Sequence, residues 1–325
     1  MTMCSPSSSY LASPDFMAVT LHSFSCVELP IMIFGAYCIL FRTPAQMSPV
    51  KWLMFNLHFW TMLSDFVMSF LGIPYILFPA LAGWGLGAVY APGLLFYVLV
   101  TLHAAIAGSV IAIYENRYYC LYGFKTKWKI YRKPTMTLLC SFIPFIFLPP
   151  YFNVPDQELA RQKVLEMLPC LQPYTYDDHP MYVLSLDPIV PFSCICLWSA
   201  IFGPLIGLFL LMILRKILTD ANNAKSLRTL QLQKKFAIAL SLQSLFLFIV
   251  IVAPIIIGHF VVLFWYYNQI LNNFIFIVMS LHGIVSATSM IFVHKPYRDF
   301  TLSLFGVASK ESNHLKKLSS VSIVL

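Results

Sequence analysis

Hydrophobic residues along this chain fall into long runs that are separated by short polar joins. The runs cover residues 16–41, 51–78, 91–114, 135–152, 189–214, 236–266 and 271–293. A helix needs about 20 apolar residues to cross the roughly 30 Å hydrocarbon core of a bilayer, and most of these runs reach that length. The pattern therefore predicts an all-α membrane protein built as a seven-transmembrane helix bundle.

The joins between the runs alternate in charge. Of the 21 Lys and Arg residues, all but Arg161 and Lys163 lie in the joins after runs one, three and five or after run seven. Positively charged loops stay on the cytoplasmic side of a membrane. We therefore expect the N-terminus outside and the C-terminus inside.

This topology divides the chain into an extracellular N-terminus at 1–15, a seven-span domain at 16–294 and a cytoplasmic tail at 295–325. Within the tail, Tyr297, Phe300, Leu304 and Phe305 share one helical face, which predicts a short amphipathic helix over 296–306 on the inner leaflet.

The longest connection is the second outer join, at 153–188, which is rich in acidic residues. The spacing of its apolar residues predicts a short surface helix over 156–168. The first outer join, at 79–91, carries three glycines and no charge, and we expect a tight turn there.

Composition excludes a water-soluble enzyme. Charged residues make up 10% of the chain, against about 25% in a soluble domain. The net charge of +8 does not indicate a nucleic-acid partner, because the positive-inside pattern accounts for nearly every basic residue; membrane lipids are the expected neighbours. Motifs for zinc, phosphate or nucleophilic catalysis do not occur, so we expect no enzymatic activity, no metal and no cofactor.

The cysteines do not form a disulfide framework. Most of the 8 lie inside apolar runs or on the cytoplasmic side, where a thiol stays reduced. Cys4 and Cys170 are the two that are clearly extracellular. A bridge between them is possible, although sequence spacing alone cannot establish its geometry.

Two acidic residues, Glu28 and Asp65, lie near the middle of the first and second runs, and His282 lies near the middle of the seventh. A charge at mid-bilayer costs about 3 kcal/mol or more, so such residues usually face the bundle interior and are paired. We expect one buried polar cluster, with Ser286 and Ser289 available as donors. It could hold a cation, a proton or waters, or it could be a neutral, hydrogen-bonded packing contact.

The third run ends in Glu115, Asn116 and Arg117. The acid can pair with the neighbouring arginine in one state and release it to a partner in another. The alternative is that Arg117 simply anchors the helix at the inner interface. His103 lies nearly four turns above Arg117 on the same helical face, at a depth that suits a ligand cavity or a hydrogen bond to a neighbouring helix.

The sixth run contains Pro254, which would form a hinge for an outward swing of the inner half of that helix. Lys234 and Lys235 lead into the run and place positive charge at the moving end. Proline is also tolerated in membrane helices without any such movement.

Short strings along the chain resemble those of nematode serpentine chemoreceptors of class H, a family of G-protein-coupled receptors. They occur at Ser13–Phe16, Pro30–Leu40, Val50–Trp52, Asn56–Trp60, Phe78–Gly83, Glu115–Arg117, Gln233–Phe236 and His294–Arg298. The resemblance spans residues 11–305. It implies a receptor in the ciliary membrane of a sensory neuron that couples binding of an odorant-like small molecule to a heterotrimeric G protein.

Two departures from the common rhodopsin-like pattern limit what the resemblance implies. No cysteine occurs between Cys38 and Cys120, so the usual bridge from the top of helix three cannot form. The seventh run ends with His294 and Lys295 before Pro296, Tyr297 and Arg298, instead of the Asn-Pro-x-x-Tyr sequence.

From their depth, we expect Tyr97, His103, Trp198 and His259 beside the ligand, among helices three, five, six and seven. Arg117 and the basic inner loops would meet the G protein. The alternatives are a ligand-gated channel or transporter, and a receptor-like protein that only escorts other receptors.

Overall fold

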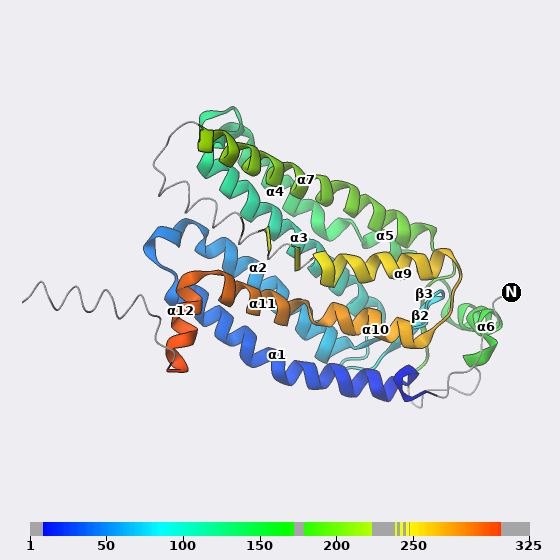
Figure 1. Cartoon of the computed structure of the whole chain (residues 1–325). Helices are drawn as coiled ribbons and strands as arrows, with labels where there is room; N and C mark the ends of the chain where they lie inside the picture. Colours follow the sequence, from blue (N-terminus) through cyan, green and yellow to red (C-terminus); the bar gives the residue numbers. More distant parts are fainter. Residues whose placement is uncertain are drawn as a thin grey trace, which may run out of the picture.

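The computed structural model describes residues 9–171, 179–222, 238, 241–242, 245–246 and 248–306. The described part is a bundle of long, roughly parallel and antiparallel helices (Figure 1). The predicted seven-transmembrane helical architecture is confirmed.

The first four spans are α1 (Pro14–Arg42), α2 (Ser48–Phe66) continued by the π-helical η3 (Val67–Gly72), α3 (Pro92–Leu121), and α4 (Trp128–Phe142) continued by η5 (Ile143–Phe145) and α5 (Leu148–Phe152). The later spans are α7 (Ile189–Asn222), the π-helical η7 (Phe248–Val252) followed by α9 (Ala253–Leu263), and α10 (Gln269–Ser280) followed by α11 (His282–Val293). Outside the spans lie α6 (Gln157–Met167), α12 (Lys295–Leu304) and the strands β1 (Pro74–Ile76), β2 (Leu81–Gly85) and β3 (Tyr182–Ser185).

Five of the described helices have the length and mean hydropathy needed to cross a bilayer. They are Pro14–Arg42, Pro92–Leu121, Trp128–Phe152, Ile189–Thr219 and Gln269–Val293. The second span falls outside this set because its helix carries several polar side chains, His58 and Asp65 among them. Within the described residues, the sixth span contributes the shorter apolar segment Phe248–Leu263.

Helix ends follow local sequence signals. Ser13 caps α1, because its hydroxyl oxygen accepts the backbone N–H of Phe16 at 3.1 Å and Pro14 takes the first helical position. Asn268 caps α10 in the same way, accepting the N–H of Leu271 at 3.0 Å.

Two spans change their helical geometry where polar or proline residues lie. The seventh span breaks at Leu281, between α10 and α11, directly before His282. In the sixth span, η7 ends at Val252 and Pro254 lies in the first turn of α9, where its missing N–H costs no helical hydrogen bond. These irregular turns mark positions where the spans can bend.

The first outer join is a β-hairpin, which corrects the tight turn expected from its sequence. The second span ends at Gly72, earlier than the hydrophobic run, and the chain continues into β1 and then antiparallel β2. Apolar content alone could not separate this strand from the helix before it, because a hairpin that packs on the bundle is itself apolar. Gly83 of β2 is required, since a Cβ there would lie 2.1 Å from the carbonyl oxygen of Tyr75.

The second outer join supplies the third strand of this sheet. β3 pairs antiparallel with β2, and the strand order is β1-β2-β3. The helix α6, capped by Asp156, lies beside the outer strand. Its Gln157 side chain exchanges two hydrogen bonds of 2.9 Å with the backbone of Val183, so it satisfies an edge that would otherwise lack a partner.

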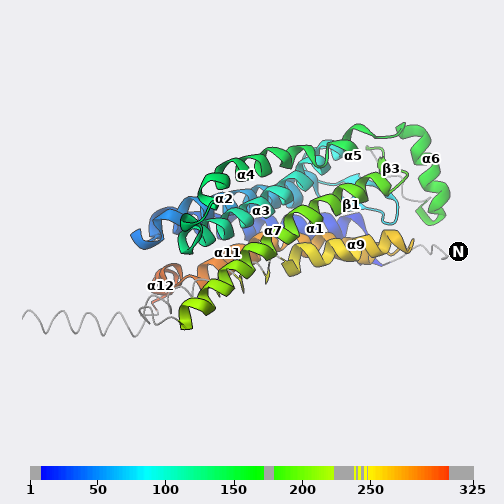
Figure 2. The ribbon, with the colours of Figure 1, turned by 90° about the horizontal axis from the view of Figure 1, so that it is seen from above.

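The two ends of the bundle therefore differ. The sheet and α6 lie at one end, and α12 lies at the other (Figure 1). We call the end that carries α12 the basic end. Lys125 and Lys127, in the join between α3 and α4, and Lys129, at the start of α4, lie there. The positive-inside rule assigns it to the cytoplasm. Seen from above, α4 lies along one edge of the bundle and α9 along the other (Figure 2).

The helix α12 packs against the start of the bundle instead of lying wholly on lipid. Tyr297 is fully buried, and its hydroxyl lies 2.7 Å from Oγ1 of Thr43, just after α1. The guanidinium of Arg42 lies 4.0 Å from the ring centre of Phe300. Leu304 and Phe305, at the far end of the same apolar face, stay exposed.

Candidate functional site

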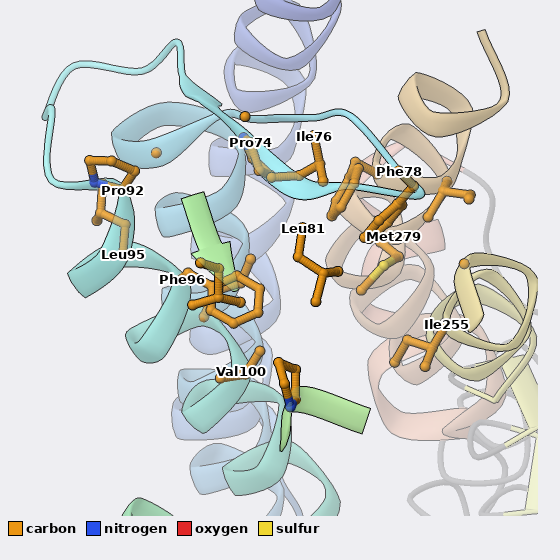
Figure 3. A pocket seen from close by; sticks show the side chains of 18 of the residues that line it. Pro74, Ile76, Phe78, Leu81, Pro92, Leu95, Phe96, Val100, Ile255 and Met279 are labelled. Atoms are coloured by element: carbon orange, nitrogen blue, oxygen red, sulfur yellow. The ribbon is translucent and has the colours of Figure 1, made fainter. Parts of the chain in front are cut away.

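A cavity of about 210 Å³ lies beneath the sheet, in the outer half of the bundle. Side chains from β1, α3, α9 and α10 converge on it, including Ile76, Leu95, Ile255 and Met279 (Figure 3). Strand β2 passes over it and contributes Leu81. The three strands, η3, the outer ends of α3 and α7, and the helices α9 and α10 thus surround one space.

The cavity wall is almost entirely apolar. No Lys, Arg, Asp or Glu occurs among the described residues that line it. The polar side chains are those of Trp84, His103, Tyr182, Trp198 and His259. Tyr182 lies on β3, and its burial raises the pKa of the hydroxyl above the usual value, so the group stays neutral.

Three of the four ligand candidates from the sequence, His103, Trp198 and His259, line this cavity. Tyr97 is not among the lining residues. Its hydroxyl donates to the carbonyl of Pro144 at 2.8 Å, and its ring lies against Tyr151. Depth along the helix was the basis of the expectation, but the rotational position of Tyr97 on α3 turns it toward η5 and α5.

Side-chain amides of α10 hold the sheet over the cavity. Asn272, fully buried, donates to the carbonyl of Phe78 at 2.9 Å, and Gln269 donates to that of Ile76 at 3.2 Å. A third amide, Asn273, donates to the carbonyl of Leu11. These three residues were not among the site residues expected from the sequence. Three amides at helical spacing, around the start of the seventh apolar run, are the signal that could have found them.

A buried polar cluster lies deeper in the bundle, among spans one, two and seven. Nδ1 of His282 lies 2.6 Å from Oδ1 of Asp65, and the carboxyl group of Glu28 lies close to that of Asp65. All three side chains are nearly inaccessible to solvent. The ring centre of His103 lies 5.4 Å from that of His282, so the cavity wall and this cluster are in contact.

The donors in this cluster differ from those expected. Ser286 is buried on α11. The hydroxyl of Ser289 donates to the backbone carbonyl of Ser286 and not to an acid. Ser69 lies beside the cluster instead: its hydroxyl donates to the backbone carbonyl of Asp65 at 2.7 Å, and the hydroxyl of Ser25 donates to Ser69 at 2.8 Å. The π-helical turn η3 begins one residue after Phe66, and its altered spacing was not readable from the sequence.

At the basic end, Glu115 pairs with α4 and not with its neighbour Arg117. One carboxylate oxygen accepts from Nη2 of Arg132 at 2.8 Å, and the other accepts from Nε1 of Trp128 at 2.7 Å. The Arg132 guanidinium also lies 3.9 Å from the ring centre of Tyr119. An ion pair between Glu115 and Arg117 was expected because only residues on the same helix can be compared from the sequence.

Arg117 lies on the last turns of α3, half-buried, beside the half-buried Asn116. Lys234 and Lys235, the expected basic charges before span six, lie outside the described residues. Pro254 lines the cavity on α9, so the expected hinge position also faces the cavity.

At the inner end of span seven, Pro296 lies in the first turn of α12 and Tyr297 is buried against Thr43. Arg298 is directed to the carbonyl of Phe292 at 3.4 Å. Burial lowers the pKa of the neighbouring His294 to about 4, so this imidazole is neutral at physiological pH.

Cys170 is disulfide-bonded, while Cys4, the partner considered from the sequence, lies outside the described residues. Six other cysteines are free thiols. Within the part of the chain that the structure describes, no group of three or more His, Cys, Asp or Glu side chains could hold a metal ion.

Comparison with known proteins places this arrangement in a family. A family model for the serpentine type 7TM GPCR chemoreceptor Srh matches residues 12–307. Serpentine receptor class H-72 of Caenorhabditis elegans is 28% identical over 331 aligned residues, which cover 96% of this chain and 91% of that protein. The match includes every described span, the sheet-covered cavity and the Glu115–Arg132 pair at the basic end. This chain therefore belongs to the Srh family of serpentine seven-transmembrane chemoreceptors.

Proposed function

We propose that this chain is a chemosensory receptor that binds a small molecule from the extracellular side and activates a heterotrimeric G protein at its basic end. One observation carries the proposal. A single unbroken helix, α3, lines the enclosed cavity through His103 and reaches the basic end with Glu115 and Arg117. Family membership supports a receptor role, and this helix supplies a physical connection between a ligand site and a partner site.

Two contacts would transmit binding to the basic end. The first is the cavity wall at Pro254, where a ligand that favours one bend of the sixth span shifts the balance between two receptor conformations. The second is the contact of His103 with His282, which joins the cavity to the Asp65 and Glu28 cluster. In the responding state, Arg117, Asn116, Lys234 and Lys235 would face the G protein.

The same proposal places the receptor in the plasma membrane, in the ciliary membrane of a sensory neuron. The uncharged cavity supports an odorant-like ligand over a peptide, because a peptide carries charged groups that need polar partners.

The test is recruitment of a soluble Gα fragment to the expressed receptor while pooled small molecules are applied. We expect ligand-dependent recruitment in the wild type and none in Arg117→Ala, with surface expression unchanged. Lys163→Ala is the matched control, since it also removes one positive charge but lies exposed on α6, at the opposite end of the bundle.

Equal recruitment by Arg117→Ala and the wild type would exclude the proposed role of Arg117. A ligand-evoked current without recruitment would support the channel alternative, and surface delivery of another receptor without either signal would support the escort alternative.

A further inference from the structure

The cavity holds several polar atoms that the protein itself leaves without partners. Nε2 of His103 and Nε1 of Trp198 are buried and have no hydrogen-bond partner among the described residues. Nδ1 of His259 is bonded, and the structure gives no partner to its Nε2. Buried polar groups in folded proteins are nearly always satisfied, so the His103 and Trp198 atoms at the cavity wall point to a ligand that completes them, and His259 offers a further site beside them.

The backbone fixes which of the two ring nitrogens carries the proton in each histidine. Nδ1 of His103 lies 2.8 Å from the carbonyl oxygen of Leu99, and Nδ1 of His259 lies 2.7 Å from that of Ile255. A carbonyl oxygen only accepts, so both Nδ1 atoms must donate. In the neutral ring, each Nε2 is then a hydrogen-bond acceptor.

The surroundings of His103 favour the neutral ring. No carboxylate lines the cavity among the described residues, and His282 stands between His103 and the Asp65 carboxylate. An imidazolium ion at the buried His103 would be desolvated without a counter-ion, which is costly. His259 packs its ring edge-to-face against Phe192, with ring centres 4.6 Å apart.

The wall therefore offers two acceptors, from α3 and α9, and one fixed donor, the Trp198 N–H on α7. Trp84 and Tyr182 also lie on the wall, but an indole N–H only donates and so offers no acceptor, and a tyrosine hydroxyl can donate or accept and does not discriminate. A ligand with only acceptor oxygens, such as a ketone or an ether, would leave both histidine acceptors unsatisfied. A hydroxyl group can donate to a histidine and can also accept.

We propose that this cavity selects small, neutral, mostly hydrocarbon molecules that carry a hydroxyl group, which donates to Nε2 of His103 or His259. The inference rests on the proposed function, because it names the ligand class of the same site. A cavity of about 150 Å³ holds benzene, so the 210 Å³ here suits a molecule modestly larger than that.

The test uses alcohols and carbonyl compounds of matched shape: benzyl alcohol with benzaldehyde, cyclohexanol with cyclohexanone, and menthol with menthone. Benzoate and benzylamine serve as charged probes. The measurement is the Kd of each probe for the purified full-length receptor in detergent, from the concentration dependence of the thermal unfolding midpoint. We expect an alcohol to bind roughly tenfold more tightly than its carbonyl partner, because the partner leaves a buried acceptor unsatisfied.

Two variants assign the effect to the histidines. His103→Phe and His259→Phe keep an aromatic ring and remove the acceptor, and at least one should abolish the preference for the alcohol. His259 is half-buried, so its variant remains informative if His103→Phe fails to fold. His22→Phe on α1, outside the cavity, should keep the preference.

Equal or tighter binding of the carbonyl partners would overturn this inference and leave small-molecule reception intact. Persistence of the alcohol preference in both histidine variants would overturn it as well. Binding of benzoate or benzylamine alone would exclude a neutral ligand. Silence from every probe would count against both the inference and the cavity as the ligand site, whereas Gα recruitment tests coupling by itself.

Discussion

Asp65 can occupy the centre of the bundle because the residue opposite it has no side chain. A Cβ placed on Gly283 would lie 1.4 Å from Oδ2 of Asp65 and 2.3 Å from Cε of Met32. The break of span seven at Leu281 brings His282 and Gly283 to this point together. The packing of Asp65 therefore depends on both His282, its partner, and Gly283, which leaves room for its carboxylate.

Gly283→Ala should therefore destabilise the receptor strongly, by roughly 3 kcal/mol or more, because Asp65 would have to leave its buried partner. The thermal unfolding midpoint and the amount of receptor at the cell surface would both fall. Gly203→Ala on α7 is the matched control: nothing lies within 4 Å of its added Cβ. That change should be neutral or slightly stabilising, since Ala favours helix over Gly. An unchanged midpoint in Gly283→Ala would contradict this packing.

Single residues show where sequence reasoning succeeds and where it stops. The burial of Glu28, Asp65 and His282 was readable, because ionisable groups at mid-membrane depth must face inward. The roles of Ser69 and Gly283 were not, because they depend on a π-helical turn and a helix break that come from packing. Tyr97 lies at the expected depth but on the wrong side of its helix.

At the scale of elements, the outer sheet is the part least visible in the sequence. Its strands come from regions that are distant along the chain, and β1 lies within the last residues of the second hydrophobic run. The length of a hydrophobic run is a local property of the sequence, and it predicted the spans. Pairing of β2 with β3 is a long-range property, and nothing in either join alone specified it.

The hydrogen bond from Asn272 of α10 to the hairpin should control access to the cavity. Asn272→Ala removes the hydrogen bond to the Phe78 carbonyl and leaves that buried carbonyl without its donor. We expect backbone amides in residues 74–85 to exchange with solvent roughly tenfold faster, as the hairpin opens more often. Mass-spectrometric hydrogen exchange measures this directly.

Asn153→Ala is the matched control for this change, because that exposed side chain lies in the same outer region, just after α5. It should leave exchange in the hairpin unaltered. Equal exchange in Asn272→Ala and the wild type would mean that strand pairing alone holds the sheet.

On the scale of the whole molecule, the pairing of Glu115 with Arg132 ties α3 to the following join and α4. The two bonds to Arg132 and Trp128 are charge-assisted and largely protected from water, which makes them stronger than an exposed ion pair. Trp128 also packs on Phe209 of α7. Movement of any one of these helices at the basic end must therefore disturb the other two.

Arg132→Ala should raise signalling in the absence of ligand, because it removes a contact that holds the basic end closed. A loss of about 1 kcal/mol would shift a two-state equilibrium roughly fivefold toward the responding form. Basal Gα recruitment is the readout. Lys163→Ala, exposed on α6 at the opposite end of the bundle, should leave it unchanged. Lower basal recruitment in Arg132→Ala would instead indicate that the pair belongs to the responding state.

The order in which the sheet is made has a consequence for how the receptor matures. A chain that emerges from the ribosome N-terminus first presents β1 and β2 after the second span, whereas β3 follows the fourth. The third strand can join only once two further spans have been threaded through the membrane. The cavity walls on α7, α9 and α10 follow β3 in the chain, so the sheet can be complete before these helices close the cavity. A hydrophobic compound present during synthesis can bind as these last helices pack, and can act as a chaperone for its own receptor.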